Sequence, residues 1–257
     1  MILYFSATGN GKYISEQIAG RTNETCMSIV DCIREDKYSF YDEKILGIVV
    51  PTYFWRLPRI VAEYLDKLRI ENCGYTFFLV SYGTTTGKAG SMAKDIMAKD
   101  IMAHHGQKFD AYYSVVMPDT WTPVFDLTDK NRVDKWLSDG KKQLELVIDN
   151  IISKRKGDFI ERKLSKWVAT IPAAYMYVTE RKTKKLSVNK EVCVGCGICA
   201  KKCPVGAIQM KEGCPVWKSE ECEMCLGCLH RCPKFAISYG NGKTDRHGQY
   251  RNPYTRI

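Results

Sequence analysis

Eight of the twelve cysteines in this 257-residue sequence fall into two copies of one spacing pattern. In each copy, two residues separate the first three cysteines from one another, and three residues precede a fourth cysteine that is followed by proline. The first copy is Cys193, Cys196, Cys199 and Cys203, and the second is Cys222, Cys225, Cys228 and Cys232. Thiolates in this arrangement are ligands of [4Fe–4S] clusters, which carry one electron at a time. The sequence therefore predicts two such clusters near its C-terminal end.

The fourth cysteine of each copy is predicted to serve the other copy, because it lies on the following turn and reaches the second cluster. Cluster one is expected to bind Cys193, Cys196, Cys199 and Cys232, and cluster two Cys222, Cys225, Cys228 and Cys203. A zinc site would use two spaced pairs, and triplets spaced by two fit metal ligation in a reducing compartment rather than disulfides. Between the runs, Cys214 is expected to be a buried free thiol, with a spare ligand as the alternative.

A different chemistry is indicated by residues 6–12, which read Ser-Ala-Thr-Gly-Asn-Gly-Lys and join a predicted strand to a predicted helix. The backbone N–H groups of such a loop, its hydroxyls and the N-terminus of the helix can bind a phosphate. A Walker loop would need Gly in place of Ser6 and Ser or Thr in place of Tyr13, and the fingerprint G-x-G-x-x-G is absent. We therefore expect a phosphate site of another kind.

Alternating apolar runs and helical patterns must position this loop. Strands are predicted at residues 1–5, 26–30, 45–50, 75–81 and 111–117, and helices at 13–19, 57–68, 89–103 and 134–152. This alternation predicts an α/β fold, a doubly wound five-stranded parallel sheet of order 2-1-3-4-5, with a ligand at the carboxyl ends of strands one and three. Residues 92–101 repeat Met-Ala-Lys-Asp-Ile, which we interpret as a local duplication without function.

The expected organisation has four parts. Residues 1–152 form the sheet domain, 153–186 a basic connector with a helix across 159–168, 187–240 the two-cluster module, and 241–257 a tail. Two further loops, 51–55 and 81–87, follow the third and fourth strands. Aromatic side chains and backbone amides there could hold a flat heterocycle and tune its redox states. Asp119 and Trp121 follow the fifth strand and border the same mouth, where simple packing is an equal alternative.

The loop at 6–12 resembles the phosphate loop of flavodoxins, Ser/Thr-x-Thr-Gly-Asn-Thr, which holds the 5′-phosphate of FMN. Its departure is Gly11, where a hydroxyl is usual, and Lys12 could supply charge instead. The loops at 51–55 and 81–87 resemble the two flavodoxin ring loops. The resemblance implies an FMN site made by Ser6, Thr8, Gly9, Asn10, Gly11, Lys12, Pro51, Thr52, Tyr53, Phe54, Trp55, Ser81, Tyr82, Gly83 and Gly87.

Nearly the whole chain, including residues 249–253 of the tail, resembles a family of anaerobe proteins. These proteins fuse a flavodoxin-like domain to a small α+β ferredoxin module with two [4Fe–4S] clusters. The resemblance implies electron transfer between the clusters and FMN, coupling one- and two-electron steps to a partner protein. The alternative is an FMN-dependent reductase of a small organic oxidant, with Tyr53, Trp55, Tyr82, Asp119 and Trp121 lining its mouth. A redox sensor is a third interpretation, but no output domain supports it.

The net charge of +10 is uneven, since residues 1–150 carry −2 and residues 151–257 carry +12. Each cluster with its four thiolates carries about −2, so part of the excess offsets the clusters. The rest is interpreted as a solvated face, or as a docking surface for an acidic redox partner, rather than a nucleic-acid site. The longest apolar stretch, 167–178, contains Pro172 and is shorter than the roughly 20 residues of a membrane span. We expect a cytoplasmic protein without a membrane span, and homo-oligomers stay an open alternative.

Overall fold

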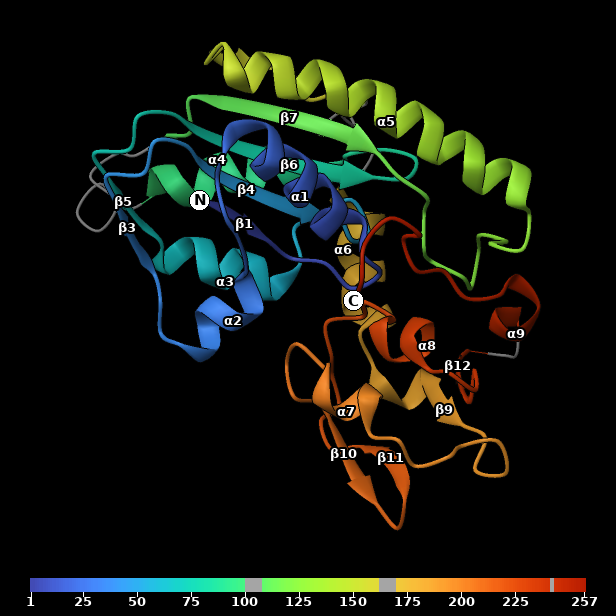
Figure 1. Cartoon of the computed structure of the whole chain (residues 1–257). Helices are drawn as coiled ribbons and strands as arrows, with labels where there is room; N and C mark the ends of the chain where they lie inside the picture. The colour runs from blue at the N-terminus through green and yellow to red at the C-terminus, as the bar shows by residue number, and fades with distance from the viewer. Residues whose placement is uncertain (100–107, 162–169, 241–242) are drawn as a thin grey trace.

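A six-stranded parallel sheet forms the centre of the N-terminal half in the computed structural model (Figure 1), which describes residues 1–99, 108–161, 170–240 and 243–257. The strand order is β2-β1-β4-β6-β7-β8. The bounds are β1 (Ile2–Tyr4), β2 (Cys26–Ser28), β4 (Leu46–Pro51), β6 (Thr76–Tyr82), β7 (Ala111–Val116) and β8 (Gly157–Asp158). The predicted order of five strands is confirmed. The edge strand β8 is additional, and its two residues are too few to leave a pattern in the sequence.

Helices cover both faces of this sheet. On one face lie α1 (Asn10–Thr22) and α5 (Lys130–Ile152), and on the other α3 (Arg59–Lys67) and α4 (Ala89–Lys99). Successive strand side chains point to opposite faces, so Val49 packs under α1 and α5 while its neighbours Ile48 and Val50 pack under α3 and α4. The predicted helix at 89–103 extends beyond α4 only into residues outside the described ones.

The second predicted strand is shorter than expected. Strand β2 ends at Ser28 because the Ser28 hydroxyl accepts the backbone N–H of Val30 at 3.2 Å. This bond caps a short helix, α2 (Ile29–Arg34), that the sequence reading missed. A second parallel pair, β3 (Ser39–Tyr41) with β5 (Arg69–Glu71), was also missed. Three-residue strands carry too little alternation to be distinguished from loops.

The C-terminal half is a small α+β unit. Its strands form two antiparallel pairs, β9 (Leu186–Val188) with β12 (Ile237–Tyr239) and β10 (Ile208–Lys211) with β11 (Cys214–Trp217). Its helices are α7 (Ile198–Lys201), α8 (Gly227–Arg231) and α9 (Lys243–His247). Before them come α6 (Thr170–Glu180) and the 3₁₀ turn Thr183–Lys185. Of the helix predicted at 159–168, residues 159–161 are not helical, and the others lie outside the described residues.

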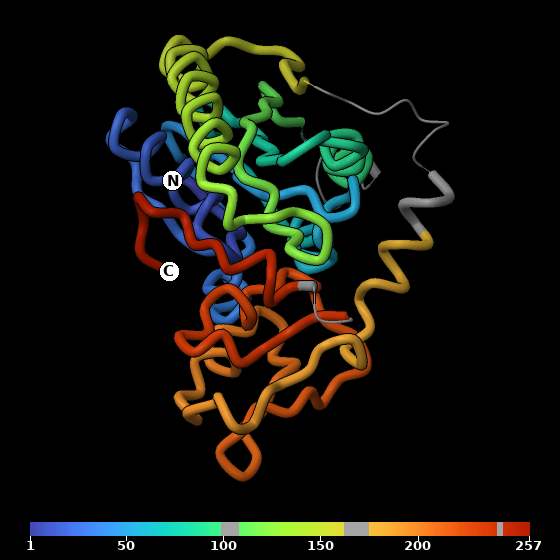
Figure 2. Tube along the Cα trace, turned by 90° about the vertical axis from the view of Figure 1, so that its right-hand side faces the viewer, coloured from blue at the N-terminus to red at the C-terminus, as the bar shows by residue number. Residues whose placement is uncertain are grey.

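The two halves are joined by more than the chain connection. The tail returns from the lower half and ends beside α1 of the upper half (Figures 1 and 2). The core of the small unit also receives Phe54 and Trp121 from loops of the sheet domain. Within the described parts of the chain, no helix combines the length and apolar character needed to cross a membrane.

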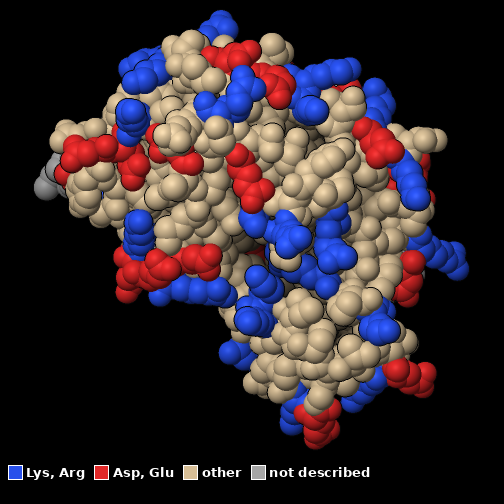
Figure 3. Space-filling model, in the orientation of Figure 1, with Lys and Arg blue, Asp and Glu red and all other residues tan. Residues whose placement is uncertain are grey.

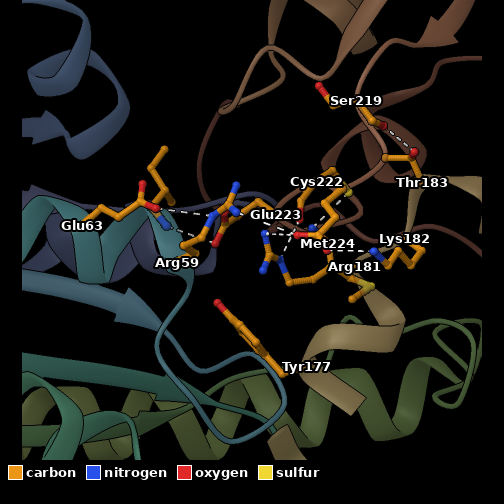
Figure 4. A network of polar contacts seen from close by, with 12 residues as sticks. Arg59, Glu63, Tyr177, Arg181, Lys182, Thr183, Ser219, Cys222, Glu223 and Met224 are labelled. Carbon is orange, nitrogen blue, oxygen red and sulfur yellow. Dashed lines mark hydrogen bonds and ion pairs between the residues drawn. The ribbon is translucent and has the colours of Figure 1, made fainter. Parts of the chain in front are cut away.

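A polar network at the base of α3 fixes the relative position of the halves (Figure 4). The buried carboxylate of Glu223 accepts a hydrogen bond from the backbone N–H of Ile60 at 3.2 Å. A residue of the cysteine-rich unit thus provides the acceptor for an N–H group in the first turn of α3. Close by, Arg181 donates from Nε to the carbonyl oxygen of Cys222 at 3.0 Å. Its Nη2 lies 3.3 Å from the carboxylate of Glu221.

Candidate functional site

A cleft of about 280 Å³ opens at the carboxyl ends of β1, β4, β6 and β7. This is the position that the strand order predicts for a ligand. Twelve of the fifteen residues implied by the resemblance line it, namely Ser6, Thr8, Asn10, Gly11, Pro51, Thr52, Tyr53, Phe54, Trp55, Ser81, Tyr82 and Gly83. Asp119 and Trp121 line the same cleft. The sequence-derived loops are therefore brought to one place.

The other three residues lie outside the lining. Lys12 turns away, because its Nζ donates to the carbonyl oxygen of Arg256 at 2.6 Å and lies 3.5 Å from the Glu16 carboxylate. Gly87 has a positive φ of 57° and supports the back of Trp55, where a Cβ would lie 2.3 Å from the Trp55 Cβ. Gly9, with φ 101°, precedes α1 and is covered by the tail. These residues shape the loops, and Lys12 does not bring its charge into the cleft.

The loop after β1 owes its shape to close backbone contacts. A Cβ on Gly11 would lie 2.8 Å from the carbonyl oxygen of Phe5, so no hydroxyl-bearing side chain fits at this position. The side chain of Asn10 is used within the protein. Its Nδ2 donates to the carbonyl oxygen of Pro118 at 3.2 Å, and its Oδ1 accepts bonds from Tyr250 and Asn252 of the tail. What this loop offers a ligand is therefore mainly the N–H groups of the first turn of α1, which lack intrahelical partners.

The loop after β4 is held in an unusual backbone conformation. Phe54 and Trp55 both have positive φ, 46° and 62°, which large side chains adopt rarely. Two backbone bonds of 2.9 Å between Tyr53 and Arg56 close the turn. The ring of Phe54 meets that of Trp121 edge-on at 5.0 Å between centroids. Together these contacts hold an aromatic wall against the cleft.

Asp119 is the acidic side chain of the cleft lining. Its carboxylate packs beside Gly83, where a Cβ would come within 2.5 Å of Oδ2. The backbone N–H of Trp121 donates to its Oδ1 at 3.1 Å. Burial raises the pKa of Asp119 to about 6, and the Trp121 N–H opposes part of that rise. The cleft thus holds a group that can gain or lose a proton near neutral pH.

Asp119→Asn is expected to remove a pH dependence of stability. Because the folded pKa of about 6 lies above the ordinary value of 3.8, the folded state binds more protons between these values, and the free energy of unfolding falls as pH rises. The wild-type protein should lose about 1 kcal/mol more than the variant between pH 5 and pH 7.5 in urea unfolding. The matched control is Asp126→Asn, since Thr128 lowers the pKa of that exposed carboxyl. Equal pH profiles for wild type and Asp119→Asn would contradict the prediction.

The eight cysteines of the two runs gather around two smaller cavities. One is lined by Cys193, Cys196, Cys199 and Cys232, and the other by Cys203, Cys222, Cys225 and Cys228. These are the two crossed sets expected from the spacing. In the described ranges of the chain, no three His, Cys, Asp or Glu side chains meet as a site for a single metal ion.

Backbone N–H groups point at several of these sulfur atoms. The N–H of Ala207 donates to Cys203 and that of Ala236 to Cys232, each at 3.2 Å and four residues after the cysteine. The N–H of Met224 donates to Cys222 at 3.3 Å. Such donors stabilise negative charge on sulfur and are one determinant of cluster potential. The equal geometry at Cys203 and Cys232 follows from the repeated sequence pattern.

Cys214 differs from its prediction. It lies in β11, partly exposed rather than buried. Its thiol lies near that of Cys193, and partial desolvation together with this neighbour raises the pKa of Cys214. The prediction of a buried thiol is wrong because one face of the short β10–β11 pair is open to solvent. The alternative of a spare ligand stays a prediction.

The cleft and one cysteine cavity share a wall. Met224, Cys225 and Leu226 line both. Sequence reasoning missed this contact, since these residues lie about 100 positions beyond the last strand loop and no spacing rule connects them. It also missed Val124 and Met176 in the lining of the cleft.

A family model for the flavodoxin domain matches residues 1–145. The chain belongs to the flavodoxin domain family. In this flavodoxin-family protein, a second family model, for a 4Fe–4S binding domain, matches residues 186–209. The pairing of these two domains supports an electron-transfer role. It also agrees with the fold, a doubly wound sheet followed by a small antiparallel unit.

Three known proteins illustrate these similarities. An uncharacterized ferredoxin of Methanocaldococcus jannaschii is 39% identical over 59 residues, covering 21% of this chain and 32% of the ferredoxin. A component of an ion-translocating oxidoreductase complex of Methanosarcina acetivorans is 42% identical over 45 residues, covering 18% of this chain and 17% of that component. The solved Trp repressor binding protein of Bacillus subtilis aligns over 61% of this chain and 100% of its own, with 12% identity and a TM-score of 0.33. The chain thus spans no more than 32% of the length of these curated relatives.

Proposed function

We propose that this flavodoxin-family protein relays electrons between two [4Fe–4S] clusters and FMN, and exchanges them with redox partner proteins. One observation carries the proposal, the wall of Met224, Cys225 and Leu226 that the cleft shares with a cysteine cavity. A ligand of cluster two would therefore border the flavin directly. Cluster one would lie farther along, so the order of the relay is cluster one, cluster two, flavin.

The residues of the cleft fit an FMN. The loop at 6–11 presents the N-terminus of α1, which favours a phosphate. Aromatic residues 53–55 and the backbone of 81–83 give the same cleft flat, apolar surfaces suited to a ring system. When bound, FMN exchanges one or two electrons, so it can join one-electron carriers to two-electron reactions. The chain's own contribution is to hold the phosphate and ring and to exclude water from them.

The cysteine cavities fit two cubane clusters. Each presents four thiols, one for each iron of a cluster. N–H donors to Cys203, Cys222 and Cys232 are already in place. Two relatives support the proposal that this protein has redox partner proteins. One is a component of an oxidoreductase complex, and another is a polyferredoxin of Methanothermus fervidus.

Asp119 favours a second candidate, a reductase of a small organic oxidant. A two-electron reduction of such a molecule also needs protons, and Asp119 places a protonatable carboxyl in the cleft. Val124, which also lines the cleft, is 64% exposed, so this part of the lining faces solvent. A small molecule could approach there.

The test is an anaerobic preparation with the cofactors counted and their reduction followed together. The relay predicts about eight irons, four per cluster, one FMN per chain, and reduction of the flavin by electrons delivered through the clusters. Irons without flavin would show that the sheet domain has another role. Flavin that stays oxidised while both clusters are reduced would refute the relay. Saturable oxidation by a small molecule would select the reductase over the carrier.

A further inference from the structure

The two cluster sites face different surroundings. The site of cluster two adjoins the cleft, and the residues Glu223, Met224 and Leu226 around it are buried. The site of cluster one includes Cys196, which is exposed. An external electron carrier therefore approaches cluster one more closely than cluster two.

Apolar side chains surround the site of cluster one on the surface. Among the described residues, five of the thirteen large exposed hydrophobic side chains lie on the segments that form this site, with exposed fractions from 36% to 59%. They are Val192, Val194, Ile198, Met210 and Val216. Three of them, Val194, Ile198 and Met210, also line the cavity itself. Apolar side chains exposed singly are ordinary on a protein surface, whereas a group of them around one site marks an interaction surface.

Lysines border this apolar centre. The exposed charged residues of the same segments near this site are Lys190, Lys201, Lys211 and Lys234, against Glu191 and Glu212. Lys202 lies on the same stretch of chain but lines the cavity of cluster two. In the part of the chain that the structure describes, none of these four lysines is in an ion pair. In Figure 3, uncharged atoms cover the middle of the lower half, Lys and Arg atoms lie on both sides of it, and Asp and Glu atoms lie at its lower edge. We call the apolar side chains Val192, Val194, Ile198 and Met210 and these four lysines the cluster-one face.

A second group of Lys and Arg side chains, at the junction of the halves, is less available to bind a partner protein. A hollow of about 130 Å³ at the junction of the halves is lined by Lys12, Arg34, Lys202 and Arg231. Three of these have partners within the chain. Lys12 pairs with Glu16, Arg34 with Asp31, and Arg231 donates to the carbonyl oxygen of Ser6. The positive charge open to a partner is therefore greater on the cluster-one face.

We propose that the cluster-one face docks an acidic one-electron carrier protein, whose own cofactor lies behind an apolar patch with a carboxylate rim. The proposal rests on the proposed relay and names the place where its electrons enter or leave. Lysines would steer the acidic partner and set its orientation. The apolar centre would exclude water between the two cofactors. A second copy of this chain is a poor occupant, because two basic faces repel each other.

The test compares two charge-reversal variants of the cofactor-loaded protein. Lys201→Glu/Lys211→Glu changes the face, and Lys141→Glu/Lys142→Glu changes the net charge equally on α5 of the sheet domain. The measurement is the second-order rate at which a reduced acidic two-[4Fe–4S] ferredoxin reduces the clusters, at low and high salt. We expect the face variant to be about tenfold or more slower at low salt. The difference should shrink at high salt, where charges are screened, while the α5 variant stays within about twofold of wild type.

An equal loss of rate in both variants would show that the effect comes from net charge alone, and it would overturn the docking proposal. An unchanged rate in both variants would overturn it as well. Reduced methyl viologen, a small cationic reductant, separates this outcome from failure of the relay. If it reduces the clusters of the face variant at the wild-type rate or faster, the variant is intact and the slow rate with ferredoxin belongs to docking. If the clusters are reduced but the flavin is not, the relay fails while the docking face stands. An iron count on each variant confirms that both clusters are present.

Discussion

Asn252→Ala is expected to weaken flavin binding about tenfold, although Asn252 belongs to the tail and not to the predicted phosphate loop. Its Nδ2 donates to Oδ1 of Asn10 at 3.1 Å, and its backbone N–H donates to the carbonyl oxygen of Thr8 at 2.8 Å. Asn252 and Asn10 are both buried. Loss of a buried hydrogen-bond partner costs about 1–3 kcal/mol, and about 1.4 kcal/mol is a tenfold change in affinity. The loss acts on flavin binding because this side-chain contact helps to hold Asn10 in the phosphate loop, while the bonds from the Tyr250 hydroxyl and from the backbone N–H of residue 252 remain.

The tail reaches the loop from the cysteine-rich half and so links the two sites. We call residues 249–257 the C-terminal strap. Gln249 donates to the carbonyl oxygens of Leu229 and Cys232, at the end of α8. The N–H of Tyr250 donates to Nδ1 of His230 at 3.1 Å, and the Tyr250 hydroxyl donates to Oδ1 of Asn10 at 2.8 Å. The strap therefore spans from α8, the helix that contains Cys228 and directly precedes Cys232, to the phosphate loop.

The orientation of His230 follows from these bonds. Its Nδ1 accepts from Tyr250, so the proton lies on Nε2, which donates to the carbonyl oxygen of Thr120 in the cleft lining at 2.9 Å. This one ring joins α8, the strap and the wall of the cleft. Because binding at linked sites is reciprocal, bound flavin should stabilise the clusters less in the strap variant than in wild type.

Flavin affinity is measured by titrating flavin-depleted protein with FMN and following the quenching of flavin fluorescence. Tyr254→Phe is the matched control, since Tyr254 lies in the same strap, is exposed, and contacts Tyr13 only through its ring. Its affinity should equal that of wild type. Wild-type affinity in Asn252→Ala would show that the phosphate loop keeps its shape without the strap.

The parts of this architecture that the sequence predicts are those with a local pattern. The apolar runs that form β4 and β6 are long enough to be recognised, and their order across the sheet follows from the alternation with helices. The crossed cysteine sets follow from the repeated spacing, and the structure brings the same sets together. Both features depend on residues close in sequence or on an exact repeat.

The parts that the sequence does not predict are contacts between distant segments. The resemblance offers Lys12 as a source of charge for the phosphate, but the carbonyl of Arg256 and the carboxylate of Glu16 draw its amine away. Asn10 has its side chain occupied by a strap more than 200 residues later. Cys225, predicted only as a cluster ligand, also forms a wall of the cleft. Neither the periodicity nor the spacing of residues along the chain predicts contacts between such distant segments.

Loss of cluster two is expected to isolate the flavin, whereas loss of cluster one is expected to isolate both other cofactors from an external carrier. Cys225→Ser removes a ligand that borders the cleft, and Cys196→Ser removes the exposed ligand of cluster one. Each variant should keep about four of eight irons. When a reduced ferredoxin is added, Cys225→Ser should still show reduction of cluster one but no reduction of the flavin. Cys196→Ser should show neither cluster two nor flavin reduced at the wild-type rate.

Cys214→Ser is the control for these ligand variants, because Cys214 lies beside Cys193 yet belongs to neither run. It should keep about eight irons and a wild-type rate of flavin reduction. Spectra of the two clusters and of the flavin, recorded together during mixing, distinguish the cases. Rapid flavin reduction in Cys225→Ser would reverse the assigned order, since electrons would then reach the cleft without cluster two. Slow reduction in Cys225→Ser alone, with Cys196→Ser like wild type, would instead place the entry of electrons at cluster two and leave cluster one as a side branch.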